Sequence, residues 1–155
     1  MKMFSWKFLL LLVGIAVAGA TIARAATKEV IWPAADIKYK EVVPGVSKVD
    51  LWGNSEKGAH GSLTKFVAGT THALHTHTQD VKIVVFSGTF VYTAENGPET
   101  KLGPGSYVLI PGGKKHSSGC TADAECQFFE EQAGKFDMKM LGAKSASNPS
   151  ETGSN

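Results

Sequence analysis

The chain has 155 residues, of which 43% are hydrophobic, so it is long and apolar enough for one domain with one core. The formal net charge is only +2, the lysines are scattered, and the one arginine is Arg24. Bidentate recognition of phosphate by arginine is therefore not available to the body of the chain, and we expect no nucleic-acid partner.

The first 25 residues have the pattern of a secretory signal peptide. Lys2 and Lys7 give a positive start, residues 8–20 form a short apolar run, and Ala23 and Ala25 are small residues where a signal peptidase reads. Because the run is too short for a membrane span, we expect cleavage after residue 25, a periplasmic or secreted protein, and no membrane attachment afterwards. An uncleaved anchor is the alternative. Cleavage removes three of the 16 basic residues and no acid, which leaves 13 basic against 14 acidic residues.

Residues 28–141 form the predicted folded domain, and their pattern is all-β. Short runs rich in β-branched and aromatic residues alternate with Gly and Pro turns, which is typical of a sandwich or a small barrel. The predicted strands are Glu29–Trp32, Ile37–Val42, Lys48–Trp52, Gly61–Val67, Ala73–His77, Val81–Phe86, Thr89–Thr93, Ser106–Ile110, Glu125–Gln132 and Phe136–Met140. Residues 142–155 are rich in Ser, Asn and Gly, and we expect a disordered tail there.

His75 and His77 are two positions apart in one predicted strand. Side chains alternate along a strand, so both imidazoles point to the same face, where they can clamp a metal ion. A His-x-His pair alone is weak evidence, because two solvated polar residues explain it equally well.

The surrounding spacing resembles the two signature motifs of the cupin superfamily. The matching positions are Gly69, His75, His77 and Gly88 in the first motif, and Gly105, Pro111, Gly113 and His116 in the second. The resemblance covers residues 63–129 and implies a single-domain antiparallel jelly-roll β-barrel with a metal inside one mouth. It carries over His75, His77 and His116 as ligands of one divalent transition metal, which is Fe, Cu, Zn, Mn or Ni. Because cupins often pair through their sheets, it also leads us to expect a homodimer.

The acidic ligand of the family's first motif is missing, because this chain has Val81 and Lys82 where it should fall. Gln79 replaces it if the strand continues, Asp80 if the chain bulges, and His72 if the preceding loop turns inward. The leading prediction is a three-histidine site with open positions. That set resembles cupins without a carboxylate ligand, which include iron-dependent dioxygenases, and it also suits Zn²⁺ with a bound water.

Cys120 stands where the second motif has an asparagine, six residues before Cys126. In an exported chain with two cysteines, a disulfide is the first interpretation. A pocket thiol at Cys120 and two free thiols are the alternatives.

Two further polar positions are weaker candidates. Glu130 and Glu131 fall on opposite faces of a strand, so one of them could point inward as a general base, although exposed strand-end acids are the simpler interpretation. His60 is interpreted as a residue of a surface loop.

Three functions fit this pattern. The first is an exported metal-dependent enzyme, oxygenase-type or Lewis-acid, acting on a small polar molecule. The second is a non-catalytic module that binds or senses a metal or a small ligand outside the cytoplasm. The third is a fold kept for assembly, with a purely structural metal. The fold alone does not choose among them.

Overall fold

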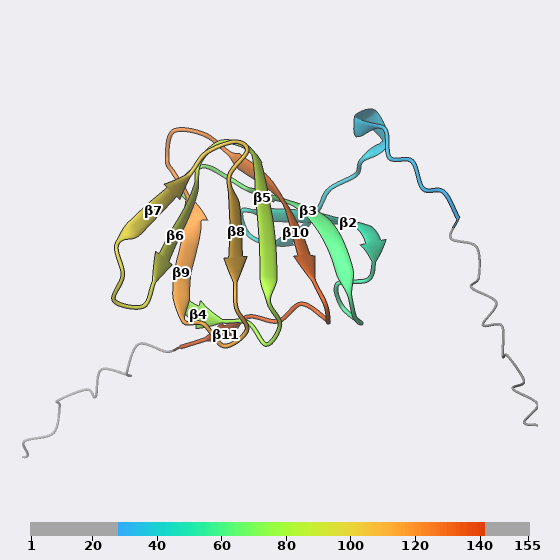
Figure 1. Cartoon of the computed structure of the whole chain (residues 1–155). Helices are drawn as coiled ribbons and strands as arrows, with labels where there is room; N and C mark the ends of the chain where they lie inside the picture. The colour runs from blue at the N-terminus through green and yellow to red at the C-terminus, as the bar shows by residue number, and fades with distance from the viewer. Residues whose placement is uncertain (1–27, 142–155) are drawn as a thin grey trace, which may run out of the picture. The chain divides into compact units, whose positions relative to one another are not determined.

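The computed structural model describes residues 28–141, and from Trp32 onward their regular secondary structure is almost entirely β-strand (Figure 1). The elements are η1 (Ala34–Asp36), β1 (Lys40–Val43), β2 (Val46–Gly53), β3 (His60–Phe66), β4 (Thr71–Thr76), β5 (Val81–Ser87), β6 (Phe90–Ala94), β7 (Glu99–Leu102), β8 (Tyr107–Ile110), β9 (His116–Cys120), β10 (Cys126–Gln132) and β11 (Lys139–Met140). Within this range no helix has the length and apolar character needed to span a membrane. The predicted signal peptide and tail lie outside the described residues.

The strands form two antiparallel sheets. The six-stranded sheet has the order β1-β2-β3-β10-β5-β8, and the five-stranded sheet has the order β11-β4-β9-β6-β7. Strands far apart in sequence lie side by side, since β10 pairs with both β3 and β5 and β9 pairs with both β4 and β6. Such crossed connections between two stacked sheets are typical of a jelly roll. The all-β jelly-roll prediction is confirmed.

Alternating side chains fill the space between the sheets. Every second residue of β10, from Cys126 to Gln132, is buried, as expected for a strand with one inward face. Phe66 and Phe128 of the six-stranded sheet contact Phe90 of the other sheet, with ring centroids 5.0–6.2 Å apart within this trio. These aromatic contacts join the two sheets into one core.

Most predicted strands are present with shifted ends, but some predictions were wrong. Glu29–Trp32 forms no strand, and Phe136–Met140 shrinks to the two residues of β11. The strands β7 and β9 were not predicted, because their sequences ETKL and HSSGC show no hydrophobic alternation. Pairing along β6 stabilises both of them, so tertiary contacts rather than propensity make these segments strands.

Candidate metal centre

Three buried histidines meet on the inner face of the five-stranded sheet. His75 on β4 and His116 on β9 are cross-strand partners, with ring centroids 4.2 Å apart. His77 follows directly after β4, and its centroid is 5.0 Å from that of His75 and 5.4 Å from that of His116. One ring nitrogen of each lies within 4.8 Å of the others. The structure thus brings the three predicted residues together.

The other ring nitrogen of each histidine faces a backbone carbonyl. The oxygen atoms belong to Ala73 (2.7 Å from His75 Nδ1), Lys114 (2.9 Å from His116 Nδ1) and Asp137 (next to His77 Nδ1). A carbonyl only accepts, so each Nδ1 carries a proton, and in the neutral form of the ring Nε2 then holds the free lone pair. This is the tautomer in which proteins hold histidine as a metal ligand.

The electrostatic state of the cluster also suits a cation. Burial, aided by the neighbouring imidazoles and opposed by the hydrogen bond to Ala73, lowers the pKa of His75 to about 4. Burial likewise lowers the pKa of His116. The Nε2 atom of His75 is buried without a hydrogen-bond partner in the described part of the chain, which is costly unless another group satisfies it. A divalent ion bound by the three lone pairs fits these observations.

None of the three candidates for a fourth ligand joins the cluster. The Gln79 side chain packs against Gly134, and Asp80 is exposed and accepts a hydrogen bond from the Gly112 backbone N–H at 2.8 Å. His72 faces the same interior, but its ring centroid is 6.2 Å from that of His75 and it stacks edge-on against Phe66 instead. The cluster of described residues therefore has three histidines and no carboxylate.

A cavity of about 570 Å³ lies between the sheets, and His77 and His116 form part of its wall. Most of the lining is apolar. The apolar members on the core side include Val46, Phe66, Val81, Ile83, Phe90, Ile110 and Phe128. The volume of this cavity suits a small organic molecule, and its apolar lining favours a ligand with an apolar body over a purely polar one.

Glu130 points into this cavity, so its interpretation as an exposed strand-end acid was wrong. It is 5% exposed and pairs with the ammonium group of Lys48 on β2, which lines the same cavity. Glu131 points outward and pairs with Lys82 at 2.8 Å. Lys48 was not predicted as a site residue, although it lies in a predicted strand in which every second side chain should point inward.

His60 is fully buried on β3, so its interpretation as a surface residue was also wrong. Its Nδ1 lies 3.0 Å from the carbonyl oxygen of Gly58 and 3.1 Å from that of Gly134. Among the described residues it belongs neither to the histidine cluster nor to the cavity wall.

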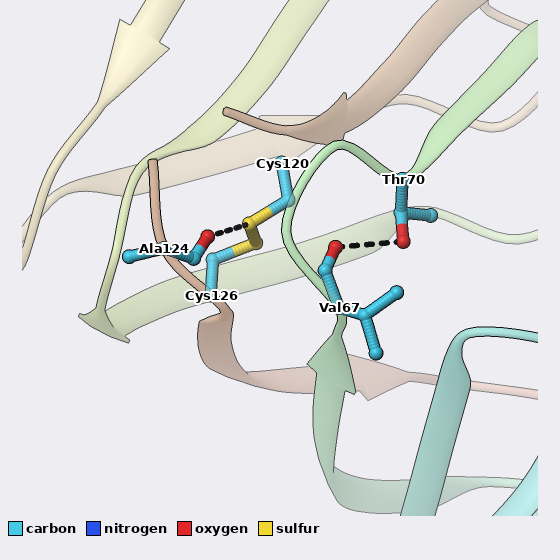
Figure 2. The surroundings of a disulfide bond; sticks show 5 residues. All are labelled: Val67, Thr70, Cys120, Ala124 and Cys126. Carbon is cyan, nitrogen blue, oxygen red and sulfur yellow. Dashed lines mark hydrogen bonds between the residues drawn. A yellow bond between two sulfur atoms is a disulfide. The ribbon is translucent and has the colours of Figure 1, made fainter. Parts of the chain in front are cut away.

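Cys120 and Cys126 are joined by a disulfide, shown in Figure 2. Their Cα atoms are 5.8 Å apart, and the bond links the end of β9 in one sheet to the start of β10 in the other. Cys120 Sγ lies 3.2 Å from the carbonyl oxygen of Ala124. Neither sulfur lines the cavity beside the histidines.

Comparison with known proteins places the chain among cupins. Residues 27–135 match the family described as the ChrR cupin-like domain. No curated protein matches at the significance required. Among solved structures, KdgF from Halomonas sp. is 20% identical, with a TM-score of 0.55 over 68% of this chain and 94% of that one.

Two further structures show the range of proteins with this fold. The polyketide cyclase RemF from Streptomyces resistomycificus is 17% identical, with a TM-score of 0.63 over 77% of this chain and 89% of that one. A salicylate 1,2-dioxygenase variant from Pseudoaminobacter salicylatoxidans, in complex with gentisate, is 21% identical, with a TM-score of 0.51 over 59% of this chain and 26% of that one. At these identities the similarity shows the fold alone.

Proposed function

The chain belongs to the ChrR cupin-like domain family, and from that premise we propose that it is an exported metal-dependent enzyme acting on a small organic molecule. The observation that carries this proposal is the convergence of three buried imidazoles, two of which, those of His77 and His116, line a cavity of about 570 Å³. His75, His77 and His116 are the metal ligands in this proposal.

A divalent ion held there would supply Lewis-acid polarisation of a ligand oxygen, or redox chemistry if the ion is iron or copper. Three neutral imidazoles leave its charge uncompensated, which favours an anionic or enolisable ligand group beside the histidines. The protein itself fixes the rings through the carbonyls of Ala73, Lys114 and Asp137 and surrounds the ligand with apolar side chains. If the ion is acquired outside the cytoplasm, intrinsic affinity favours copper and zinc over iron and manganese.

A binding or sensing module is the second candidate function. It is favoured by the pairing of Glu130 with Lys48, because a carboxylate that is already bound to an ammonium group is not free to contact a substrate proton. The two functions differ in turnover, not in metal content.

The test is the metal content of protein that is purified from the exported fraction without chelator. Inductively coupled plasma mass spectrometry measures it. We expect close to one transition-metal ion per chain, and almost none in the variant His75→Ala/His77→Ala. His72→Ala, which removes a neighbouring imidazole outside the cluster, is the matched control and should keep its metal. Full metal content in the double variant would refute the site. Turnover of small carbonyl compounds, thiols and phenols by the loaded protein then separates an enzyme from a sensor.

Export has its own test. The intact mass of the purified protein should correspond to a chain that begins at Ala26, as expected for cleavage after Ala25. A chain that keeps residues 1–25 would contradict this part of the proposal without affecting the metal site.

A further inference from the structure

Besides the histidines of the five-stranded sheet, two polar residues of the six-stranded sheet lie on the wall of the same cavity. Lys48 on β2 and Thr64 on β3 are direct cross-strand partners, and both line the cavity. Thr64 is 2% exposed, and its hydroxyl oxygen has no hydrogen-bond partner among the described residues. A buried hydroxyl without a partner is unfavourable, so this atom indicates a group that completes the site.

The Lys48 ammonium group has more N–H donors than its pairing with Glu130 uses. It has three N–H bonds, and Glu130 is its only charged partner in the described part of the chain. The pairing with Glu130 and the contact with the Phe136 ring, whose centroid is 4.2 Å from Nζ, hold the side chain in place inside the cavity. A second acceptor can therefore bind to an ammonium group that is already positioned.

One aromatic ring contacts both Lys48 and the histidine cluster. The Lys48 ammonium group lies over the Phe136 ring, 4.2 Å from its centroid, and the same centroid is 5.6 Å from that of His77. A ligand that extends from the histidines to Lys48 passes along Phe136 and the apolar wall of the cavity. Such a ligand needs polar groups at both ends and an apolar body between them.

We propose that Lys48 and Thr64 form a carboxylate-binding subsite, so that the natural ligand is a small organic acid with an apolar body. One carboxylate oxygen accepts from the Lys48 ammonium group and the other from the Thr64 hydroxyl, while a second polar group of the ligand faces the histidines. The orientation toward the histidines rests on the proposed function. The carboxylate subsite itself does not, because neither of its residues is a metal ligand.

The test compares carboxylates with their neutral amides, which match them in shape. The probes are benzoate, phenylacetate and hexanoate, each with its amide, titrated by calorimetry into zinc-loaded and metal-free protein. In the wild-type protein we expect at least one carboxylate to bind about tenfold more tightly than its amide, because an ammonium group bonds more strongly to an ionised carboxylate oxygen than to a neutral amide oxygen. The same preference in metal-free protein separates this subsite from the metal site.

Two variants locate the subsite. Lys48→Met/Glu130→Gln removes both charges, so that no buried charge is left unpaired, and Thr64→Val keeps the side-chain shape while removing the hydroxyl. We expect the first to abolish the preference for carboxylate and the second to reduce it about fivefold, as for one hydrogen bond. The control Lys82→Met/Glu131→Gln removes a similar ion pair from the outer face of the same sheet and should change nothing.

Three results would overturn the inference: no carboxylate bound better than its amide, an unchanged preference in Lys48→Met/Glu130→Gln, or an equal loss in the outer-face control. Loss of metal binding in the histidine variants, with the carboxylate preference intact in metal-free protein, supports the subsite. Failure of the wild-type protein to bind metal would contradict the proposed function but not the carboxylate subsite.

Discussion

The backbone carbonyl of Asp137 accepts the Nδ1–H of His77 across 60 residues of sequence. The carboxylate of the same Asp137 accepts from the backbone N–H of Thr78 at 2.8 Å and from its hydroxyl group. Hydrogen bonds from the Thr78 hydroxyl and backbone lower the pKa of Asp137, which means that they favour its charged form. The backbone of Asp137 therefore fixes the His77 ring, and its side chain fixes the segment that follows β4.

We expect Asp137→Ala to weaken metal binding by about tenfold, the low end of the cost of disturbing a group that orients a metal ligand, because the backbone carbonyl stays while the carboxylate that ties it to Thr78 is lost. The His77 ring remains, so the metal is bound less tightly rather than lost. Competition with a chromophoric chelator measures the change. Asp123→Ala, which removes an exposed carboxylate from the loop between β9 and β10, should leave the affinity unchanged. Equal affinities in the two variants would show that the Asp137 carboxylate does not help to position His77.

A pH prediction concerns Asp50, which lies on β2 and accepts from Ser62 Oγ at 2.7 Å and from the N–H and hydroxyl of Ser55 at 2.8 and 3.0 Å. Burial would raise the pKa of Asp50, but these hydrogen bonds outweigh it and the pKa is lowered. A folded pKa below the unfolded value of about 3.9 means that Asp50 stabilises the protein above that pH. The contribution is lost as the pH falls from about 4 through the folded pKa.

Urea unfolding of metal-free protein at a series of pH values measures this loss. Asp50→Asn should be less stable than wild type at neutral pH and should show a shallower fall in the free energy of unfolding below about pH 4. Asp36→Asn, which changes an exposed carboxylate on η1, is the control and should follow the wild-type curve. If Asp50→Asn also follows the wild-type curve, the hydrogen bonds to Asp50 do not contribute to the pH dependence of stability.

The histidine cluster was predictable because the spacing of Gly, Pro and His resembles the two cupin motifs, whereas strand alternation by itself placed only His75 and His77 on one face. The strand that carries His116 was not predictable, because HSSGC has no alternation and forms only between β4 and β6. The tautomers of the three rings could not be predicted from the sequence either, since they depend on carbonyl groups that the fold brings close. Lys48 and Glu130 lie 82 residues apart, so their pairing inside the cavity depends on the register of β2, β3 and β10.

The disulfide gives a stability prediction, because it joins β9 to β10 around a short loop. Closing so short a loop stabilises the protein by about 2 kcal/mol at most in the chain-entropy model. Cys120→Ala/Cys126→Ala should therefore lower the free energy of unfolding by up to this amount while metal content stays the same, since neither sulfur lines the cavity. Unreduced, denatured wild-type protein from the exported fraction should show no reactive thiol. Two reactive thiols would contradict the bond.

The last prediction compares two glycines that share a left-handed backbone but differ in their surroundings. Gly88 has φ +67°, and a Cβ placed there would lie 2.2 Å from the carbonyl oxygen of Glu125 and 2.7 Å from Cys126 Cα. Gly105 has φ +83°, and nothing lies within 4 Å of its Cβ position. Replacement by alanine at either position costs about 1 kcal/mol for the backbone conformation. Only Gly88→Ala adds a clash with rigid backbone.

We therefore expect Gly105→Ala to lower the free energy of unfolding by about 1 kcal/mol, and Gly88→Ala by a further 1–3 kcal/mol or so. Urea unfolding at a fixed pH, with the slope of the transition checked for constancy, measures both values. A larger effect at Gly88 would mean that the closing glycine of the first motif is required because β5 and β6 turn tightly against the start of β10. Equal costs would mean that the loop between β9 and β10 moves aside, and that the left-handed conformation alone requires glycine there.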